Sequence, residues 1–362
     1  MFDVIVIGLG AMGSSAFYHL ANAKAKVLGI DKFTPPHDNG SSHGETRLIR
    51  KAYFEHSDYV PLLNRAYDLW EKIEKESGRR IFNKTGVTIF GPEGSNILGG
   101  IKEAASTHKI DIVEKCPSDF PHPFRVDENW RVITEPTGGY LLVDDAIESH
   151  LHLAQKKGGT IKGNCQVHSW SADEQGVCVR TNDGEFRAKK LVITGGAWSS
   201  GLLGFPHQSL SVHRVPLFWY NTPKDWNYQE CFALDTNEGF FYGFSPINGL
   251  LKLSLHLAGE KTDPDKLCKA VNQEESDAIR NVVGKYLGQT LEPIKSSVCM
   301  YTMTSDSHFI IDQHPAKKNV TYACGFSGHG FKFASVIGEV LKELCLEGKS
   351  SQPIEFLRHQ RT

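Results

Sequence analysis

The sequence predicts an α/β protein in which one discontinuous α/β domain accompanies a second domain with a mainly antiparallel sheet. The first observation is the apolar, β-branched run Asp3–Ile7, which precedes a glycine-rich loop and a helical stretch. Strand and glycine patterns return at Leu191–Ala197 and in Asn319–Gly348, which ends in a long helix with one apolar face. Between them, short alternating runs from Val212 to Leu257 indicate an antiparallel sheet.

Composition and charge exclude several classes of protein. The chain has 362 residues, of which 40% are hydrophobic, and this allows one large domain or two closely joined ones. The net charge is -2 without a basic block for nucleic acid, and no run approaches the ~20 apolar residues of a membrane helix. The N-terminus lacks the basic region of a signal peptide. The eight cysteines are scattered without zinc spacing. We therefore expect reduced thiols in a cytoplasmic protein, and no metal, membrane or nucleic-acid partner.

The glycine loop after the first strand has the spacing of a dinucleotide cradle. Gly8 permits the tight turn, Gly10 lets the backbone approach a pyrophosphate, and Gly13 allows the helix to pack closely on the strand. A second apolar run, Lys26–Ile30, ends in Asp31, which is placed to accept hydrogen bonds from a ribose. The alternative is a chance glycine-rich turn in an ordinary βαβ unit. The loop alone leaves FAD and NAD open.

A basic segment follows, with His43, Arg47 and Arg50 close together. If the chain is helical from Thr46, Arg47 and Arg50 lie three residues apart on one helix face. Two guanidinium groups on one face suit a carboxylate or the edge of a cofactor. The alternative is a solvated surface pair.

The run Leu251–Leu257 alternates between leucine and polar residues, which predicts a strand with Lys252, Ser254 and His256 on one face. Such a polar row usually faces solvent, but beside a flat cofactor it would line the wall of a cavity. The aromatic run Phe240–Phe244 supplies neighbours for such a cavity.

Two further segments are candidates for chemistry. Cys299 begins the segment Cys299–Thr304, and a single cysteine of this kind is ordinarily packing material. The segment Gly325–Lys332 is a glycine-rich junction between a strand and a helix, and its backbone donors would stabilise an anionic ring. Lys332 falls in the first helical turn, an unusual place for a cation without an anion nearby. The alternative is a plain glycine loop.

Taken together and in order, these segments resemble the monomeric sarcosine oxidase and N-methyltryptophan oxidase family over nearly the whole chain. The most specific pieces are NGSSHGETRLIR (Asn39–Arg50), KTGVTIFGP (Lys84–Pro92), CMYTMTSDSHFIID (Cys299–Asp312) and GFSGHGFKFA (Gly325–Ala334). The resemblance implies a discontinuous Rossmann-type FAD-binding domain and a catalytic domain with a mainly antiparallel sheet. It implies FAD attached covalently through its 8α-methyl group to Cys299. We expect residues 1–80, 138–205 and 300–362 to form the FAD-binding domain, and 81–137 and 206–299 the catalytic domain.

The resemblance also assigns roles to individual residues. It places Lys252 at the flavin for oxygen reduction, His43 and Arg47 beside the flavin ring, and His256 in the catalytic cavity. Arg50 and Lys332 bind the substrate carboxylate, and Tyr242 and Tyr301 line the substrate cavity. The residues expected to bind the cofactor are Gly8, Gly10, Gly13, Asp31, Cys299, Gly328 and Gly330.

The function implied is an FAD-dependent oxidase of secondary N-methyl amino acids such as sarcosine, which uses O2 and yields H2O2 and formaldehyde. We expect the protein to be a monomer. Alternatives are an N-methyltryptophan or pipecolate-type oxidase, a flavin dehydrogenase with another electron acceptor, and a non-catalytic flavin-binding protein. Val113–Arg131 is shorter than its family counterpart and lacks Arg-Trp-Pro, and the Tyr242–Lys252 connection is one residue short. Both departures leave the identity of the amine open.

Overall fold

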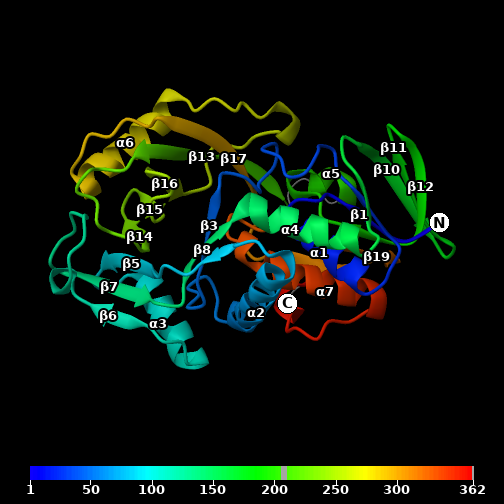
Figure 1. The fold of residues 1–362 in the computed structure, drawn as a ribbon, viewed down its shortest axis with the longest axis horizontal. Helices are drawn as coiled ribbons and strands as arrows, with labels where there is room; N and C mark the ends of the chain where they lie inside the picture. The colour runs from blue at the N-terminus through cyan, green and yellow to red at the C-terminus, as the bar shows by residue number, and fades with distance from the viewer. Residues whose placement is uncertain (205–209, 361–362) are drawn as a thin grey trace.

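The computed structural model describes residues 1–204 and 210–360. Two eight-stranded sheets dominate it, one on the right and one on the left of Figure 1, and a three-stranded sheet lies between them. The predicted α/β fold, with a discontinuous Rossmann-type part and a mainly antiparallel part, is confirmed.

The first large sheet contains the glycine-loop strand at its centre. Its parallel strands run in the order β9-β2-β1-β12-β19, and antiparallel strands extend it through β10 and β11 and through β18. Its strands are β1 (Phe2–Ile7), β2 (Val27–Ile30), β9 (Thr160–Lys162), β10 (Val167–Asp173), β11 (Gly176–Thr181), β12 (Gly184–Ile193), β18 (Ile310–His314) and β19 (Lys317–Cys324). Val4–Ile7 of β1 and the whole of β2 are buried and carry no polar side chain, because both of their faces are covered.

Helices from distant parts of the chain cover one face of this sheet. Val4 and Val6 of β1 pack in one cluster with the apolar faces of these helices, whereas Ile5 and Ile7 face a second cluster that includes β10 and β11. The helices are α1 (Ala11–Asn22), α2 (Tyr59–Ser77), α4 (Val143–Lys156) and α7 (Ala334–Glu347). This domain is therefore assembled from the beginning, the middle and the end of the chain, as Figure 1 shows by colour.

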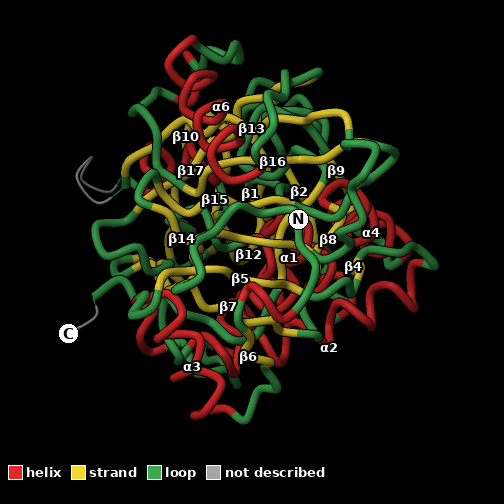
Figure 2. Tube along the Cα trace, turned by 90° about the vertical axis from the view of Figure 1, so that its left-hand side faces the viewer, coloured by secondary structure: helices red, strands yellow, loops and turns green. Residues whose placement is uncertain are grey.

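The second large sheet has the strand order β17-β13-β16-β15-β14-β5-β7-β6. Its pairs are antiparallel except for β14 with β5, which is parallel. Its strands are β5 (Val87–Pro92), β6 (Val113–Lys115), β7 (Trp130–Glu135), β13 (Ser211–Asn221), β14 (Cys231–Thr236), β15 (Gly239–Gly243), β16 (Leu250–His256) and β17 (Lys295–Met303). Helices α3 (Asn96–His108) and α6 (Gln273–Leu287) lie at opposite ends of it in Figure 2.

The small sheet corrects one prediction. Residues Thr46–Ile49 form strand β3, not a helix, and β3 pairs with β8 (Gly139–Leu142), which also pairs with β4 (Phe82–Asn83). Arg47 therefore lies in a strand and Arg50 directly after it, and their nearness to the site comes from the strand and not from a shared helix face. The pairing partner is some ninety residues away in the chain, and no local pattern contains it.

The remaining elements are short. They are α5 (Ser199–Leu203) and the 3-10 turns at Pro117–Asp119, Gly196–Trp198, Pro264–Lys266, Phe331–Phe333 and Glu355–Leu357. The expected division into domains stays a prediction: β17 crosses the expected boundary at residues 299 and 300, and the boundary at 205 and 206 lies outside the described residues. In the described part of the chain, no helix is long and apolar enough to cross a bilayer.

Candidate active site

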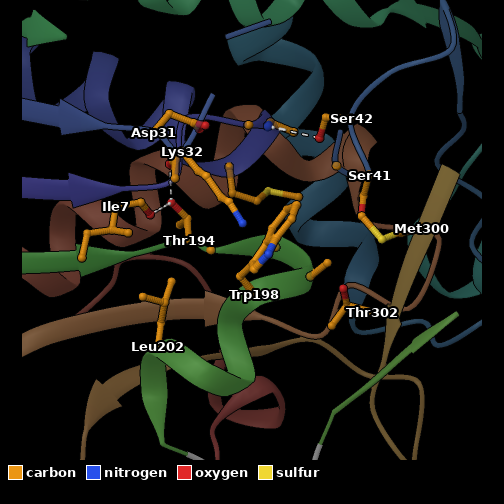
Figure 3. Close-up of a pocket in the computed structure, with 18 of the residues that line it drawn as sticks. Ile7, Asp31, Lys32, Ser41, Ser42, Thr194, Trp198, Leu202, Met300 and Thr302 are labelled. Atoms are coloured by element: carbon orange, nitrogen blue, oxygen red, sulfur yellow. Dashed lines mark hydrogen bonds between the residues drawn. The ribbon is translucent and has the colours of Figure 1, made fainter. Parts of the chain in front are cut away.

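A cavity of about 420 Å³ opens where the parallel strands β1, β2, β12 and β19 end. The residues that follow these strands line it, as the labelled Ile7, Asp31 and Thr194 show in Figure 3. The carboxyl ends of the strands in an open parallel sheet are the usual place for a dinucleotide. The cavity continues past Met300 and Thr302 of β17, and so reaches the second large sheet.

The predicted glycine cradle forms one wall of this cavity. Gly8 has a φ of +85°, and a Cβ atom there would lie 2.4 Å from the carbonyl oxygen of Thr194. A Cβ atom at Gly13 would lie 1.7 Å from the Gly8 oxygen, because α1 packs directly on the loop. At Gly10 it would meet only the Ser42 hydroxyl at 3.6 Å, since this residue faces the cavity. The sequence interpretation of the three glycines agrees with these positions.

Asp31 stands at the carboxyl end of β2, inside the same cavity. Its buried carboxylate accepts hydrogen bonds from the backbone N–H groups of Leu9, at 2.6 Å, and Phe33, at 2.9 Å. The His37 imidazole lies 3.3 Å from the same carboxylate. Asp31 therefore fixes the glycine loop as well as presenting an acceptor to the cavity, and the first of these roles was not predicted.

The N-terminus of α1 and the loop before β3 meet at the middle of the cavity. The backbone N–H of Ala11 donates to the Ser42 hydroxyl at 3.3 Å, which Figure 3 draws as a dashed line. Next to it, His43 is buried, and its Nε2 has no hydrogen-bond partner among the described residues. Burial, with a smaller effect of Arg47, lowers the pKa of His43 to about 4. His43 itself lines neither cavity, unlike its neighbours Ser42 and Arg47.

A second, smaller cavity of about 80 Å³ adjoins the first. The two share Arg47, Tyr301, Gly328 and Phe331 as lining residues. The glycine at 328 is required there, because its φ is +80° and a Cβ atom would lie 2.4 Å from the Tyr301 ring. Gly330 lines only the larger cavity. A Cβ atom at this position would lie 2.5 Å from the Phe326 side chain, so Gly330 also packs too closely for a larger residue.

Arg50 and Lys332 both line the small cavity and both are buried. Arg50 donates to the Ala52 carbonyl at 2.7 Å and to Glu55 Oε2 at 2.9 Å, while the Lys332 ammonium donates to the His329 carbonyl at 2.7 Å. Burial lowers the pKa of Lys332 to about 7, although Glu55 opposes this effect. Burial by itself would raise the pKa of the Glu55 carboxyl group. The positive charge of Arg50, with smaller effects of His329 and Lys332, outweighs burial and lowers this pKa to about 2.

Cys299 lies in β17, the edge strand of the second large sheet. It is buried and lines the small cavity. Its Sγ lies 3.3 Å from the Ser41 carbonyl oxygen and 3.5 Å from Arg47 Nη2.

The polar row on β16 does not face solvent. The Lys252 ammonium is buried and donates to the Thr46 carbonyl at 3.0 Å and to the Gly44 carbonyl. Ser254 donates to the Pro216 carbonyl at 2.7 Å, so both side chains support the chain next to the cavity and do not line it. Burial and Arg47 lower the pKa of Lys252 well below its usual value.

His256, at the end of the same row, does line the small cavity, together with Tyr242 and Tyr301. Its Nδ1 lies 3.0 Å from the Tyr301 hydroxyl. Burial lowers the pKa of His256 to about 4 and raises the pKa of both tyrosines. All three groups are therefore uncharged near neutral pH and polarise the cavity only through hydrogen bonds.

Several residues of the site were not found from the sequence. Glu55, Phe54 and His329 line the small cavity, and Phe240, mentioned only as an aromatic neighbour, lines it as well. Glu135, at the end of β7, holds the backbone that follows Arg50. The only local hint was that Glu55 is an acid five residues after the candidate Arg50. In a loop this spacing does not predict a contact between the two side chains. In the described residues, no group of three or more His, Cys, Asp or Glu side chains is arranged to hold a metal ion.

The amino-acid sequence is similar to those of known proteins over nearly the whole chain. Residues 3–344 match the family described as FAD dependent oxidoreductase. The monomeric sarcosine oxidase of Bacillus sp. (strain B-0618) is 38% identical, and the match covers 99% of this chain and 96% of the relative. The N-methyl-L-tryptophan oxidase of Citrobacter koseri is 34% identical, with 96% of this chain and 95% of the relative covered.

Solved structures share the fold. NikD, described as an unusual amino acid oxidase essential for nikkomycin biosynthesis, superposes with a TM-score of 0.87 at 22% identity and covers 99% of this chain and 97% of its own. Glycine oxidase from Geobacillus kaustophilus has a TM-score of 0.82 at 17% identity and covers 100% and 99%. The large cavity, its glycine cradle and these matches agree, and the chain therefore belongs to the FAD-dependent oxidoreductase family, as a flavin-dependent amine oxidoreductase related to the monomeric sarcosine oxidases.

Proposed function

We propose that this protein oxidises secondary N-methyl amino acids such as sarcosine, with O2 as the electron acceptor. The observation that carries the proposal is the small cavity with two buried cations, Arg50 and Lys332, which joins the FAD cavity at Arg47 and Tyr301. The reaction converts an N-methyl amino acid, O2 and water into the primary amino acid, formaldehyde and H2O2. Bound FAD would supply the redox chemistry, since it can accept a hydride, which carries two electrons, from the carbon next to the amine and can pass these electrons to O2.

The substrate carboxylate binds between Arg50 and Lys332 in this proposal. Both cations are buried, and the carboxylate of Glu55 lies 2.9 Å from Arg50, which shows that an anion fits at this position. A bound amino acid competes with Glu55 for Arg50. Two charge-assisted contacts at one end of the molecule fix its orientation, so that the amine carbon points toward Arg47 and Tyr301.

The charged and the neutral groups of the small cavity together set the protonation state of the substrate amine. Arg50 and Lys332 favour loss of the ammonium proton, because like charges lower the pKa of a nearby amine. His256 and Tyr301 are joined by a hydrogen bond and offer lone pairs to the N–H of the amine. The reactive form of the substrate is the neutral amine, whose carbon gives up a hydride readily.

We further propose that the FAD is covalently attached at Cys299 and that Lys252 promotes its oxidation by O2. The support for the first point is the buried thiol beside Arg47 at the junction of the cavities. The support for the second is the buried ammonium of Lys252, which is held by the loop at Gly44 and Thr46 and stabilises negative charge as O2 is reduced. The absence of disulfides among the described cysteines is consistent with a cytoplasmic enzyme, and the relatives' name with a monomer.

A peroxide-coupled screen tests the proposed reaction. Purified protein is given sarcosine, N-methyltryptophan, pipecolate and the primary amino acid glycine, while oxygen uptake and peroxide are recorded. We expect peroxide and formaldehyde in equal amounts from sarcosine, and little from glycine. Turnover that needs an artificial dye and consumes no O2 would show a dehydrogenase instead.

Acid precipitation tests the covalent attachment. We expect a yellow pellet from the wild type, and a colourless pellet with a yellow supernatant from Cys299→Ser. Cys231→Ser is a matched control, because that thiol is also buried but lies in β14 and lines neither cavity. A colourless wild-type pellet would contradict the attachment without affecting the proposed reaction.

A further inference from the structure

The small cavity has an aromatic wall formed by Phe54 and Phe240. Their rings meet edge to face, with centroids 5.5 Å apart and planes at 67°. Phe240 also faces the His256 ring at 6.5 Å, and the two residues are cross-strand partners on β15 and β16. The wall therefore runs from the loop after β3 to the histidine of the catalytic cavity.

Phe54 is held in place from three sides. The Arg50 guanidinium lies 4.3 Å from the centre of its ring, and Phe240 covers its edge. Its backbone rests on helix α3 at Gly100, where a Cβ atom would come within 3.0 Å of the Phe54 carbonyl oxygen. The residue also packs against the apolar cluster that contains Leu98 and Ile101 of α3. A ring fixed in this way does not rotate freely to enlarge the cavity.

The size of the cavity limits what it holds. Its volume of about 80 Å³ is close to half of the roughly 150 Å³ apolar cavity that takes up benzene. Sarcosine is about as large as benzene, so a compact N-methyl amino acid already fills this cavity and extends toward the larger cavity that adjoins it. A benzyl or indolyl side chain would need at least a benzene-sized volume in addition.

From these observations we propose that Phe54, together with Phe240, is the specificity-determining wall of the site, and that it restricts substrates to compact secondary amino acids. The α-carbon of these substrates carries hydrogen or a methyl group, as in sarcosine and N-methylalanine. N-methylphenylalanine and N-methyltryptophan are excluded by contact with Phe54. This assignment rests on the proposed function, because it names the substrate class of that same cavity.

Substitution of the wall tests the assignment. The variants are Phe54→Ala, the milder Phe54→Val, and Phe240→Ala, each in the flavin-loaded protein. Phe120→Ala is the matched control, since Phe120 is a partly buried ring of an aromatic cluster that lines neither cavity. For each protein, kcat/KM is measured with sarcosine and with N-methylphenylalanine.

We expect the wild type and Phe120→Ala to prefer sarcosine strongly. Phe54→Ala should raise the ratio of kcat/KM for N-methylphenylalanine over sarcosine by at least about tenfold, because even one methylene in a tight pocket changes discrimination by about that factor. Phe54→Val should raise it less. An unchanged ratio in all three wall variants would overturn the assignment, as would a wild type that uses both substrates equally.

A binding series separates this assignment from the proposed function. Flavin absorbance is titrated with acetate, benzoate and indole-3-acetate, which need no turnover. We expect the wild type to bind acetate and reject the two larger carboxylates, and Phe54→Ala to bind all three. If no amino acid is oxidised but the series still shows this pattern, the proposed function fails and the aromatic wall stands. If the wild type binds indole-3-acetate as tightly as acetate, the wall is refuted whatever the enzyme oxidises.

Discussion

At the scale of single residues, the site is unusual in burying several cations close together. Arg50, Lys252 and Lys332 are each less than a tenth exposed, and Arg50 alone has a carboxylate partner within salt-bridge distance. The two lysines are held by carbonyl oxygens and by aromatic rings, with Lys252 lying 4.8 Å from Phe244 and Lys332 5.0 Å from Tyr53. Buried charge of this kind is costly to keep and is characteristic of a site that binds or stabilises anions.

The first prediction concerns Lys252. Lys252→Met should slow the reaction of the reduced enzyme with O2 by about 100-fold or more, because it removes a preorganised charge at the point where negative charge develops. Reduction by sarcosine should change far less. Stopped-flow measurement of the two half-reactions checks this.

The matched control is Lys295→Met. Lys295 also lies over the Trp219 ring, at 4.5 Å against 5.6 Å for Lys252, but it is exposed. The Lys295→Met variant should leave the rates of both half-reactions unchanged. A Lys252→Met enzyme that keeps full reactivity with O2 would refute the oxygen role of Lys252.

The second prediction is a pH dependence of carboxylate binding. The pKa of Lys332 is lowered to about 7 by burial, so the lysine loses its charge as the pH rises through that value. The pKa values of Glu55, about 2, and His329, about 3, lie too far below this range to contribute. The affinity for acetate should therefore be full below about pH 7 and should fall by up to about tenfold per pH unit above it.

Titrations of flavin absorbance with acetate between pH 6 and 9 measure this dependence. Lys332→Met should bind acetate more weakly at pH 6 and show no fall across the range. Lys342→Met serves as a control, because Lys342 lies on α7 outside both cavities. A wild-type affinity that stays constant up to pH 9 would exclude Lys332 as the titrating group.

At the scale of elements, the site depends on one contact between β7 and the loop that follows β3. The buried Glu135 carboxylate accepts hydrogen bonds from the N–H groups of Lys51, at 2.9 Å, and Ala52, at 2.8 Å, and from the Thr137 hydroxyl at 3.0 Å. The Ala52 carbonyl in turn accepts a hydrogen bond from the Arg50 guanidinium. The second large sheet thereby fixes Arg50, the residue proposed to bind the substrate carboxylate.

The third prediction is that Glu135→Ala weakens carboxylate binding through Arg50. The free energy of unfolding should fall by about 1–3 kcal/mol, because two buried N–H groups lose a charged partner. The Kd for acetate should rise by about tenfold, while the rate of flavin reduction at saturating sarcosine changes little. Glu135→Gln keeps one acceptor oxygen and should recover part of the affinity.

Thermal unfolding and acetate titrations test this pair of effects. Glu93→Ala is the control, since that exposed acid follows β5 and binds only Arg131 among the interactions described. If Glu135→Ala lowers stability but leaves the Kd for acetate unchanged, Glu135 is a structural residue and does not position Arg50.

At the scale of the whole molecule, the segment between β16 and α6 leaves the second large sheet and reaches the FAD cavity. Asp265 of this segment lines that cavity and binds the Lys32 ammonium and, at 2.8 Å, the Trp198 indole N–H. Lys269 reaches Asp38 at 2.8 Å. The two halves of the molecule are thus tied together at the mouth of the cofactor cavity.

The fourth prediction is that Asp265→Ala loosens the retention of FAD. The contacts are partly exposed, so the effect should be small: the Kd for FAD should rise by about 2- to 5-fold, as is usual for surface ion pairs. The measurement is reconstitution of a Cys299→Ser protein, in which the flavin is free to dissociate. Lys266→Ala, in the same segment and largely exposed, should have no effect. Equal Kd values for both variants would show that the segment does not retain FAD.

Much of this architecture follows from local sequence patterns. The alternation in Leu251–Leu257 correctly placed Lys252, Ser254 and His256 on one face of β16, because side chains alternate in any strand. The same pattern left open whether that face meets solvent or protein. The loop at Gly44 and Thr46 packs against this face of β16 and buries it. No pattern within β16 shows that this loop lies there.

The helix expected from Thr46 was wrong for a related reason. Arg47 and Arg50 have the spacing of a helix face, but β3 gains its hydrogen bonds from β8, far away in the chain. Phe54 and Glu55 in the loop after β3, and Glu135 at the end of β7, escaped notice because a single phenylalanine or acid at such a position has no local signature. Their importance arises only where α3, β7 and the loop after β3 come together.

The sequence by itself predicted the glycine cradle, the two kinds of sheet and the discontinuous α/β half, and its resemblance to a known family supplied most of the candidate site residues. The cradle and the sheets depend on φ angles, side-chain size and the two- and 3.6-residue periods, which are properties of short segments. Only the tertiary structure decided which charges are buried, which carbonyls hold them and how large the substrate cavity is. Those quantities depend on contacts between residues far apart in the chain, and the free energy of each contact depends on the water that the whole fold excludes.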